Sequence, residues 1–200
     1  MIFIGDVHGK WDKYFSLLET IKDKSIQLGD FGMGFHPTPL PWNKKHVFIR
    51  GNHDNPDICR KHSNYLGEYG ITEDGIFYVG GAFSIDKQYR LNYQAVTGKQ
   101  VWWANEQIDK KYHAEILYLY DKEKPKIVAT HDCPACIRKQ LSDVKDQFKN
   151  DTSDILFEKM FKIHKPKLWI FGHYHKSAKI ILDKITFICL NELERFEYEV

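Results

Sequence analysis

Apolar positions recur along this chain with two different periods, and these periods predict alternating strands and helices. Residues at helical spacing predict amphipathic helices around 11–21, 104–119 and 155–163, with Pro125 ending the second. A short helix is also expected to start at Asn55-Pro56, since proline is tolerated in a first helical turn. Short apolar runs predict the strands Ile2–Ile4, Ser25–Leu28, His46–Arg50, Ile76–Val79, Lys126–Thr130, Leu168–Gly172, Ala178–Leu182, Ile185–Leu190 and Phe196–Val200.

The order of these elements predicts an α/β fold. The early strands alternate with helices, which is typical of a parallel sheet. The last strands follow one another closely, so the carboxyl-terminal part is expected to form an antiparallel meander. A chain of 200 residues can bury one substantial core but is short for two, and we expect a single domain over residues 1–200.

Three segments are predicted to be loops, and none of them carries a signature for a ligand. Phe31–Asn43 contains repeated glycine and proline together with aromatic residues, which predicts a packed or substrate-facing loop. Ala82–Trp103 ends in two tryptophans that either belong to the core or stack on a ring of the substrate. Ser142–Ser153 is almost wholly polar and is expected to be an exposed loop or a short surface helix.

Composition and charge narrow the class of protein. The net charge of +2 does not call for a nucleic-acid or acidic-membrane partner, and no apolar run approaches the roughly 20 residues that span a bilayer. The amino terminus enters a strand at once, without a basic and apolar signal segment, which predicts a cytoplasmic protein. The four cysteines are not expected to form a disulfide framework, and Cys133 and Cys136 are interpreted as part of a loop that turns into a short helix.

Polar clusters stand directly after several of the predicted strands. The carboxyl ends of strands are where open α/β sheets place their functional sites. Aspartate, histidine and asparagine supply the nitrogen and oxygen donors that hold first-row divalent metals. The clusters are Gly5-Asp6-Val7-His8-Gly9, Gly29-Asp30, Gly51-Asn52-His53-Asp54, Thr130-His131-Asp132 and Gly172-His173-Tyr174-His175.

The spacing inside the clusters indicates two ions. Asp6 and His8 are two residues apart, so on an extended segment both side chains point to the same side and can hold one ion. Asp30 could bridge two ions with its two carboxylate oxygens. Asn52, His131 and His173 would hold the second ion, and His175 could return to the first.

In order and in type, the five clusters resemble the sequence blocks of the calcineurin-like metallophosphoesterase family. The resemblance implies that Asp6, His8, Asp30 and His175 bind one metal, and that Asp30, Asn52, His131 and His173 bind the other. It also implies a four-layer α/β/β/α sandwich, with two mixed β-sheets flanked by helices. The second block lacks the Asp-Arg pair that the protein-phosphatase branch of the family carries there.

A dinuclear centre of this kind predicts phosphoester hydrolysis. Two carboxylates against two divalent ions and a bridging hydroxide leave a net positive centre that can host a phosphate oxyanion and supply the attacking hydroxide. Mn, Fe, Zn, Co and Ni all suit these mixed nitrogen and oxygen donors. His53 is predicted to protonate the leaving oxygen, Asp54 to fix its tautomer, and Arg50 to contact the phosphate in a bidentate manner.

The favoured hypothesis is a phosphomonoesterase that acts on a phosphoprotein, a nucleotide or another small phosphorylated molecule, because Arg50 suits a phosphate dianion. A phosphodiesterase or nuclease is the alternative, although the near-neutral charge does not favour a nucleic-acid substrate. A binding or scaffold protein without catalysis is the third hypothesis, since a fold does not determine a function. The oligomeric state cannot be derived from the sequence.

Overall fold

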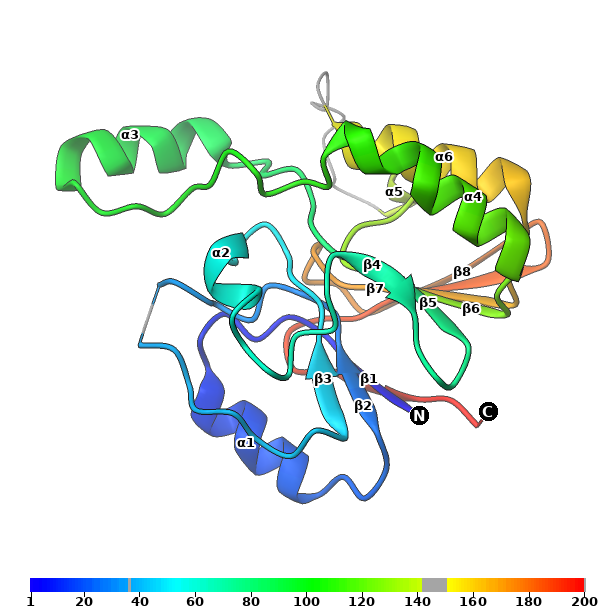
Figure 1. Cartoon of the computed structure of the whole chain (residues 1–200), viewed down its shortest axis with the longest axis horizontal. Helices are drawn as coiled ribbons and strands as arrows, with labels where there is room; N and C mark the ends of the chain where they lie inside the picture. The colour runs from blue at the N-terminus through cyan, green and yellow to red at the C-terminus, as the bar shows by residue number, and fades with distance from the viewer. Residues whose placement is uncertain (36, 142–150, 200) are drawn as a thin grey trace.

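A computed structural model of the chain describes residues 1–35, 37–141 and 151–199. Its strands form two mixed sheets, which Figure 1 shows at the centre of the molecule. The four-stranded sheet has the order β10-β1-β2-β3 and consists of β1 (Ile2–Ile4), β2 (Ser25–Gln27), β3 (His46–Phe48) and β10 (Arg195–Glu197). The six-stranded sheet has the order β4-β5-β6-β7-β9-β8 and consists of β4 (Tyr69–Ile71), β5 (Ile76–Val79), β6 (Ile127–Thr130), β7 (Leu168–Phe171), β8 (Ala178–Leu182) and β9 (Ile185–Cys189).

Helices cover the outer face of each sheet. In Figure 1, α4 and α6 lie side by side over the six-stranded sheet, and α1 lies below the four-stranded sheet. The described helices are α1 (Trp11–Glu19), α2 (Pro56–Cys59), α3 (Lys87–Thr97), the 3₁₀ helix Lys110–Tyr112, α4 (His113–Glu123), α5 (Ala135–Arg138) and α6 (Thr152–Ile163). The predicted four-layer sandwich with two mixed sheets is therefore confirmed.

Alternation of side chains along each strand builds the layers. In β5, Ile76 and Tyr78 pack into the core between the two sheets, whereas Phe77 and Val79 pack against the helices. A third cluster, which includes Tyr14 and Phe48, fills the space between the four-stranded sheet and α1. Burial of both faces explains why the strands are short runs of almost uninterrupted apolar residues.

The structure corrects three predictions of secondary structure. Helix α4 begins at His113 rather than near residue 104. The carboxyl-terminal strands do not form a simple meander, because β9 pairs in parallel with β7 and β10 crosses to the other sheet to pair with β1. The segment Ala82–Trp103, predicted as a loop, contains the 11-residue helix α3.

Of the other two predicted loops, the described part of Phe31–Asn43 holds no helix and no strand of a sheet, as expected. Most of Ser142–Ser153 lies outside the described residues, and Thr152 and Ser153 already belong to α6. All four cysteines are free. In the part of the chain that the structure describes, none of the helices has the length and the apolar character needed to cross a membrane.

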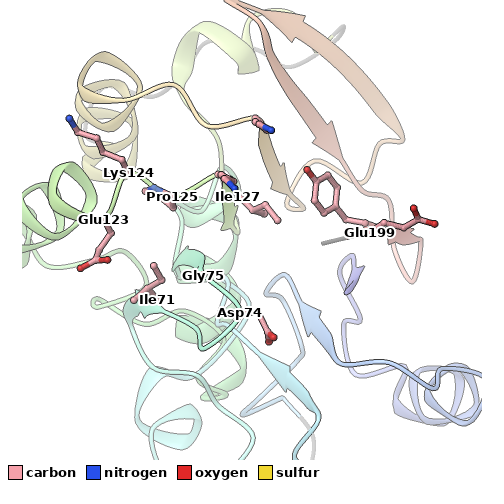
Figure 2. Close-up of a pocket in the computed structure, with 11 residues that line it drawn as sticks. Ile71, Asp74, Gly75, Glu123, Lys124, Pro125, Ile127 and Glu199 are labelled. Carbon is pink, nitrogen blue, oxygen red and sulfur yellow. The ribbon is translucent and has the colours of Figure 1, made fainter.

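A cavity of about 630 Å³ opens at the amino ends of the central strands of the six-stranded sheet (Figure 2). Ile71, Asp74, Glu123 and Ile127 are among the residues that line it. None of the described histidines lines this cavity, and the polar clusters follow the opposite ends of the strands. The cavity is therefore separate from the chemistry that the sequence predicts.

Candidate metal centre

The predicted ligands all lie in loops that follow the carboxyl ends of strands. Asp6, Asp30 and Asn52 come after β1, β2 and β3 of the four-stranded sheet. His131 and His173 come after β6 and β7 of the six-stranded sheet. The site is therefore built from both sheets, at the ends opposite the cavity of Figure 2.

One group of donors consists of Asp6, His8, Asp30 and His175, whose donor atoms lie within 4.8 Å of one another. His175 Nε2 is 3.2 Å from a carboxylate oxygen of Asp6 and 2.8 Å from His8 Nε2. His8 Nε2 is also 3.8 Å from Asp30 Oδ2. This is the set of residues that the family resemblance implies for one metal.

A second group shares Asp30 with the first and adds His131 and His173. His131 Nε2 is 3.2 Å from Asp30 Oδ1 and 3.2 Å from Asn52 Oδ1. The rings of His131 and His173 approach edge to face, with 4.9 Å between their centres. The structure thus brings all seven predicted ligands together in two groups that meet at Asp30.

The donor atoms of the second group are free to face an ion. The Nδ1 atom of His131 donates to the carbonyl oxygen of Leu28 at 2.7 Å, so Nε2 is the nitrogen that can bind an ion once its proton has left. The Nε2 atom of His173 is buried and has no hydrogen-bond partner among the described residues. The amide nitrogen of Asn52 donates to Ser84 Oγ at 3.2 Å, so its Oδ1 faces the histidines. Nitrogen and oxygen donors in this arrangement fit two first-row divalent metals.

Two glycines leave the space that the ligands occupy. A Cβ atom at Gly51 would lie 2.1 Å from Asp30 Oδ1 and 2.6 Å from His131 Nε2. A Cβ atom at Gly172 would lie 2.2 Å from Asp6 Oδ1. Any larger residue at either position would displace a ligand.

Four of the ligand residues have left-handed backbone conformations. The φ angles are 49° at His8, 54° at Asp30, 71° at His173 and 50° at His175. Asp6 and His8 do lie together as expected, with 3.7 Å between Asp6 Oδ2 and His8 Nε2, although the chain turns at His8 and is not extended there. Non-glycine residues in this region cost about 1–3 kcal/mol each and are concentrated at functional sites.

Charge and burial act against each other on the ligands. Burial alone would raise the pKa of Asp30, but the neighbouring histidines, above all His131, hold it well below its usual range. Burial lowers the pKa of His131, yet the carboxylates of Asp30 and Asp6 raise it to about 10. For His173, burial and the neighbouring His131 lower the pKa to about 3. Without metal, the site therefore holds a proton at His131 and a neutral ring at His173.

Arg50 does not face the metal ligands, which corrects its predicted contact with phosphate. The guanidinium is 1% exposed and donates to Glu68 at 2.8 Å and to the carbonyl oxygens of Glu106 and Gln107. The close approach of Gly81 to Arg50 Nη1 explains the Gly80-Gly81 pair in the sequence. Arg50 thus has a structural role, because it connects the end of β3 to Glu68 and to the backbone at residues 106–107.

Asp54 does not contact the ring of His53, which corrects its predicted role in fixing the tautomer. The carboxylate is fully buried and, among the described residues, accepts hydrogen bonds from backbone amides alone. The donors are the amides of Phe31, Gly32, Met33 and Gly51. Asp54 therefore ties the loop after Asp30 to the turn that carries Asn52.

His53 stands at the edge of the site, beside a small hollow. The hollow has a volume of about 110 Å³ and is lined by His8, Gly32, Phe35 and His53. The ring of Phe35 stacks on that of His53, with 6.0 Å between centres. The hollow is open to solvent and adjoins His8, one of the predicted ligands.

Sequence reasoning missed three polar residues that support the site. Ser84 accepts from the Asn52 side chain, Glu106 accepts from the Ser84 hydroxyl at 2.5 Å, and Arg90 contacts both Ser84 and His53. No spacing signal connects these residues to the blocks. Two residues next to predicted ligands also contact each other. Tyr174, which lies between His173 and His175, is buried and donates through its hydroxyl to Asp132, which follows His131.

The family model of the calcineurin-like phosphoesterases matches residues 1–177. The chain therefore belongs to the calcineurin-like phosphoesterase family. No curated protein is similar enough to the chain to count as a relative.

Two solved structures resemble the chain at low sequence identity. One is a proposed 5′-nucleotidase from Staphylococcus aureus in complex with alpha-ketoglutarate, with a TM-score of 0.49 and 14% identity. The match covers 97% of this chain but only 49% of that one, so the chain spans about half its length. The other is GAP50, the anchor in the inner membrane complex of Plasmodium, with a TM-score of 0.45, 12% identity, and coverage of 96% of this chain and 71% of that chain. The family assignment rests on the family model alone.

Proposed function

We propose that this protein is a metal-dependent hydrolase of phosphate esters. The observation that carries the proposal is the pair of donor groups that share Asp30, one with His8 and His175 and the other with His131 and His173. Two divalent cations bound there would activate a water molecule and stabilise the charge of the phosphoryl group. Mn, Fe, Zn, Co and Ni are the proposed ions, because all of them suit histidine with carboxylate.

The chain itself would orient the ligands and assist the leaving group. Backbone amides hold the carboxylates in place, since His53 N donates to Asp30 at 2.7 Å and His173 N donates to Asp6 at 3.1 Å. In hydrolysis the water oxygen bonds to phosphorus while the ester P–O bond breaks, and the leaving oxygen takes up a proton. His53 borders the hollow beside the ligands and is the proposed donor to that oxygen.

The first test measures turnover after reconstitution with Mn, Fe, Zn, Co or Ni. The substrates are an aryl monoester, an aryl diester, nucleotides, cyclic nucleotides and a phosphopeptide. Asp30→Asn should abolish metal-dependent turnover, because both donor groups lose their shared carboxylate. His164→Gln is the matched control, since His164 lies at the end of α6 and outside both groups, and it should retain activity. Absence of turnover with every metal and substrate would exclude the enzyme and favour a scaffold.

The structure removes the reason to prefer monoesters over diesters as substrates. The sequence argument for a monoester depended on Arg50, whose guanidinium is now buried against Glu68. The small hollow at His53 gives no separate reason to prefer a dianion. We therefore propose the diesterase alongside the monoesterase, and the ratio of the two aryl-ester rates separates them. The single domain over residues 1–200 and the cytoplasmic location stay predictions.

A further inference from the structure

The segment 82–103 forms an arm that projects from the body of the protein (Figure 1). Helix α3 makes up its outward half, and residues 98–103 lead the chain back. The side chain of Gln94 accepts hydrogen bonds from the amides of Val101 and Trp102 at 2.8 and 2.5 Å. The ammonium of Lys87 lies over the ring of Trp102, 4.4 Å from its centre. The returning segment is therefore attached to the helix.

A buried polar contact closes the base of the arm. Glu106 accepts from the backbone amide of Ser84 at 2.9 Å and from its hydroxyl at 2.5 Å. Both residues are buried, and Ser84 in turn accepts from the side chain of the ligand Asn52. The base of the arm is thus in direct contact with the metal centre.

Within α3, all of whose residues are described, Arg90 alone is buried. Its guanidinium, 3% exposed, points out of the helix and into the site. Nη1 donates to the carbonyl oxygen of Asn52 at 3.2 Å and to Ser84 Oγ at 2.9 Å, and Nη2 donates to His53 Nδ1. A helix with one buried residue therefore places the cation of Arg90 next to His53, the proposed proton donor to the leaving oxygen.

The contact with Arg90 determines which nitrogen of His53 carries the proton. A guanidinium has only donors, so the Nδ1 atom that it meets must be an acceptor. The proton of a neutral imidazole then resides on Nε2. Nε2 of His53 has no hydrogen-bond partner among the described residues, and the ring borders the hollow beside His8.

Two carboxylates compensate the charge of Arg90. Moving its guanidinium out to bind a substrate anion would break these contacts at a cost in free energy. Its Nε atom is 3.5 Å from Asp86, and Nη1 is 4.0 Å from Glu106. Its guanidinium also lies 5.7 Å from the centre of the Phe35 ring. A buried guanidinium held by two carboxylates and three hydrogen bonds is a fixed part of the structure.

We propose that Arg90 is a positioning residue for His53: it fixes the ring with Nε2–H directed to the leaving oxygen and so makes the arm 82–103 part of the catalytic apparatus. The inference about catalysis rests on the proposed phosphoesterase function. The inference about the ring of His53 does not, because the contact exists in the protein without metal or substrate.

The first experiment observes the tautomer of His53 in the metal-free full chain. Histidine side chains are labelled with ¹⁵N, two-bond ¹H–¹⁵N spectra are recorded, and the signals of His53 are assigned by their loss in His53→Gln. The expected result is a single tautomer with the proton on Nε2. A proton on Nδ1 in the wild type would overturn the proposal, and this test needs no Arg90 variant to fold.

The second experiment removes the guanidinium of Arg90, which donates to His53 Nδ1. In Arg90→Met, His53 should populate both tautomers, whereas in Arg90→Lys the remaining donor should largely retain the Nε2 form. Arg195→Met is the matched control, because Arg195 is exposed on the edge strand β10 and should leave the His53 signals unchanged. Unchanged His53 signals in both folded Arg90 variants would contradict the proposal.

The third experiment measures catalysis with a series of aryl esters that differ in leaving-group pKa. Arg90→Met should lower kcat about 10- to 100-fold with a smaller change in KM, as expected for a residue that acts through another. The loss should grow as the leaving group becomes poorer. The double variant Arg90→Met, His53→Gln should be no slower than His53→Gln alone. Additive losses would show that Arg90 does not act through His53.

The outcomes separate the two proposals. If no metal gives turnover in the wild type but the tautomer follows Arg90, the proposed function fails and the positioning of His53 stands. If turnover is normal and the tautomer is independent of Arg90, the positioning role fails and the phosphoesterase stands.

Discussion

Asp30 connects the two donor groups, and its carboxylate already has an arranged environment before any metal binds. The amide of His53 and the ring of His131 both contact Oδ1. Burial of an unpaired carboxylate would be costly and would raise its pKa, but the charge of the neighbouring histidines, above all His131, holds the pKa of Asp30 low. The donor groups are already assembled without metal, so a metal that binds His131 must displace the proton of its ring.

This exchange predicts that metal binding releases a proton. Asp30 and Asp6 raise the pKa of His131 to about 10, so the ring is protonated at pH 7.5 in the metal-free protein. Mn²⁺ affinity should rise about tenfold per pH unit from this proton alone. Calorimetric titrations in two buffers with different ionisation enthalpies measure the release, with His164→Gln as a control. Equal enthalpies in both buffers would contradict the prediction.

At the residue scale the sequence predicted which candidate ligands lie together, but not the residues that surround them. All seven predicted ligands lie together, because each is in a loop that follows the carboxyl end of a strand. Arg50 also follows β3, two residues before Asn52, yet its side chain is buried against Glu68. A position just after a strand therefore indicates which end of the sheet a residue occupies, but not where its side chain points. The contact between Arg90 and His53 joins two segments that have no common pattern.

At the element scale, the amino terminus of α6 contains an unusual cap. Asp151 accepts hydrogen bonds from the amides of Ser153 and Asp154, as an N-cap does. Burial and the neighbouring carboxylates of Asp132 and Asp154 raise its pKa to about 8. Arg138 compensates only part of this charge, with 3.6 Å between its Nη1 and Asp151 Oδ2.

The raised pKa predicts a loss of stability with rising pH. The folded state holds the proton of Asp151 more tightly than the unfolded state, so its contribution is complete below pH 3.8 and is lost as the pH rises through about 8. Asp151→Asn keeps the capping oxygen and removes the titration, so its free energy of unfolding should decrease less than that of the wild type between pH 6 and 9. Urea unfolding of both proteins at pH 6 and at pH 9 measures these changes in the free energy of unfolding.

A matched variant separates the cap from the charge. Asp151→Ala also removes the titration but loses the capping oxygen, which should cost about 1 kcal/mol relative to Asp151→Asn. A wild type and an Asp151→Asn variant with parallel pH dependence would show that the carboxyl group of Asp151 does not titrate in this range.

The elements themselves were predicted where their patterns are strong. Helix α1 and the central strands follow clear apolar periods and appear where expected. Helix α3 was missed, because it packs only Arg90 inward and so lacks an apolar stripe. The parallel pairing of β9 with β7 could not be seen either, since pairing order is decided by contacts between distant segments.

At the scale of the whole molecule, the candidate metal centre joins the two sheets. Asp6, Asp30 and Asn52 belong to loops of the four-stranded sheet, whereas His131 and His173 belong to loops of the six-stranded sheet. Because the complete donor set exists only in the folded arrangement, bound metal should stabilise the fold as a whole.

Removal of metal should therefore lower the thermal midpoint. Saturation at about 100 times Kd should add about 2.7 kcal/mol to the free energy of unfolding. Thermal unfolding with Mn²⁺ and with a chelator measures the difference. Asp30→Asn should lose most of this response, whereas Asp74→Asn, on the opposite side of the molecule, should retain it. A response of equal size in both variants would place the stabilising ion elsewhere.

The left-handed backbone at His8 and His175 implies a trade-off between the stability of the fold and its proposed activity. Glycine or asparagine would adopt these angles with less strain, but neither supplies an imidazole. A library selected for heat resistance alone, without metal or substrate, should therefore lose these histidines early. Selection for turnover would restore them, and with them the strain.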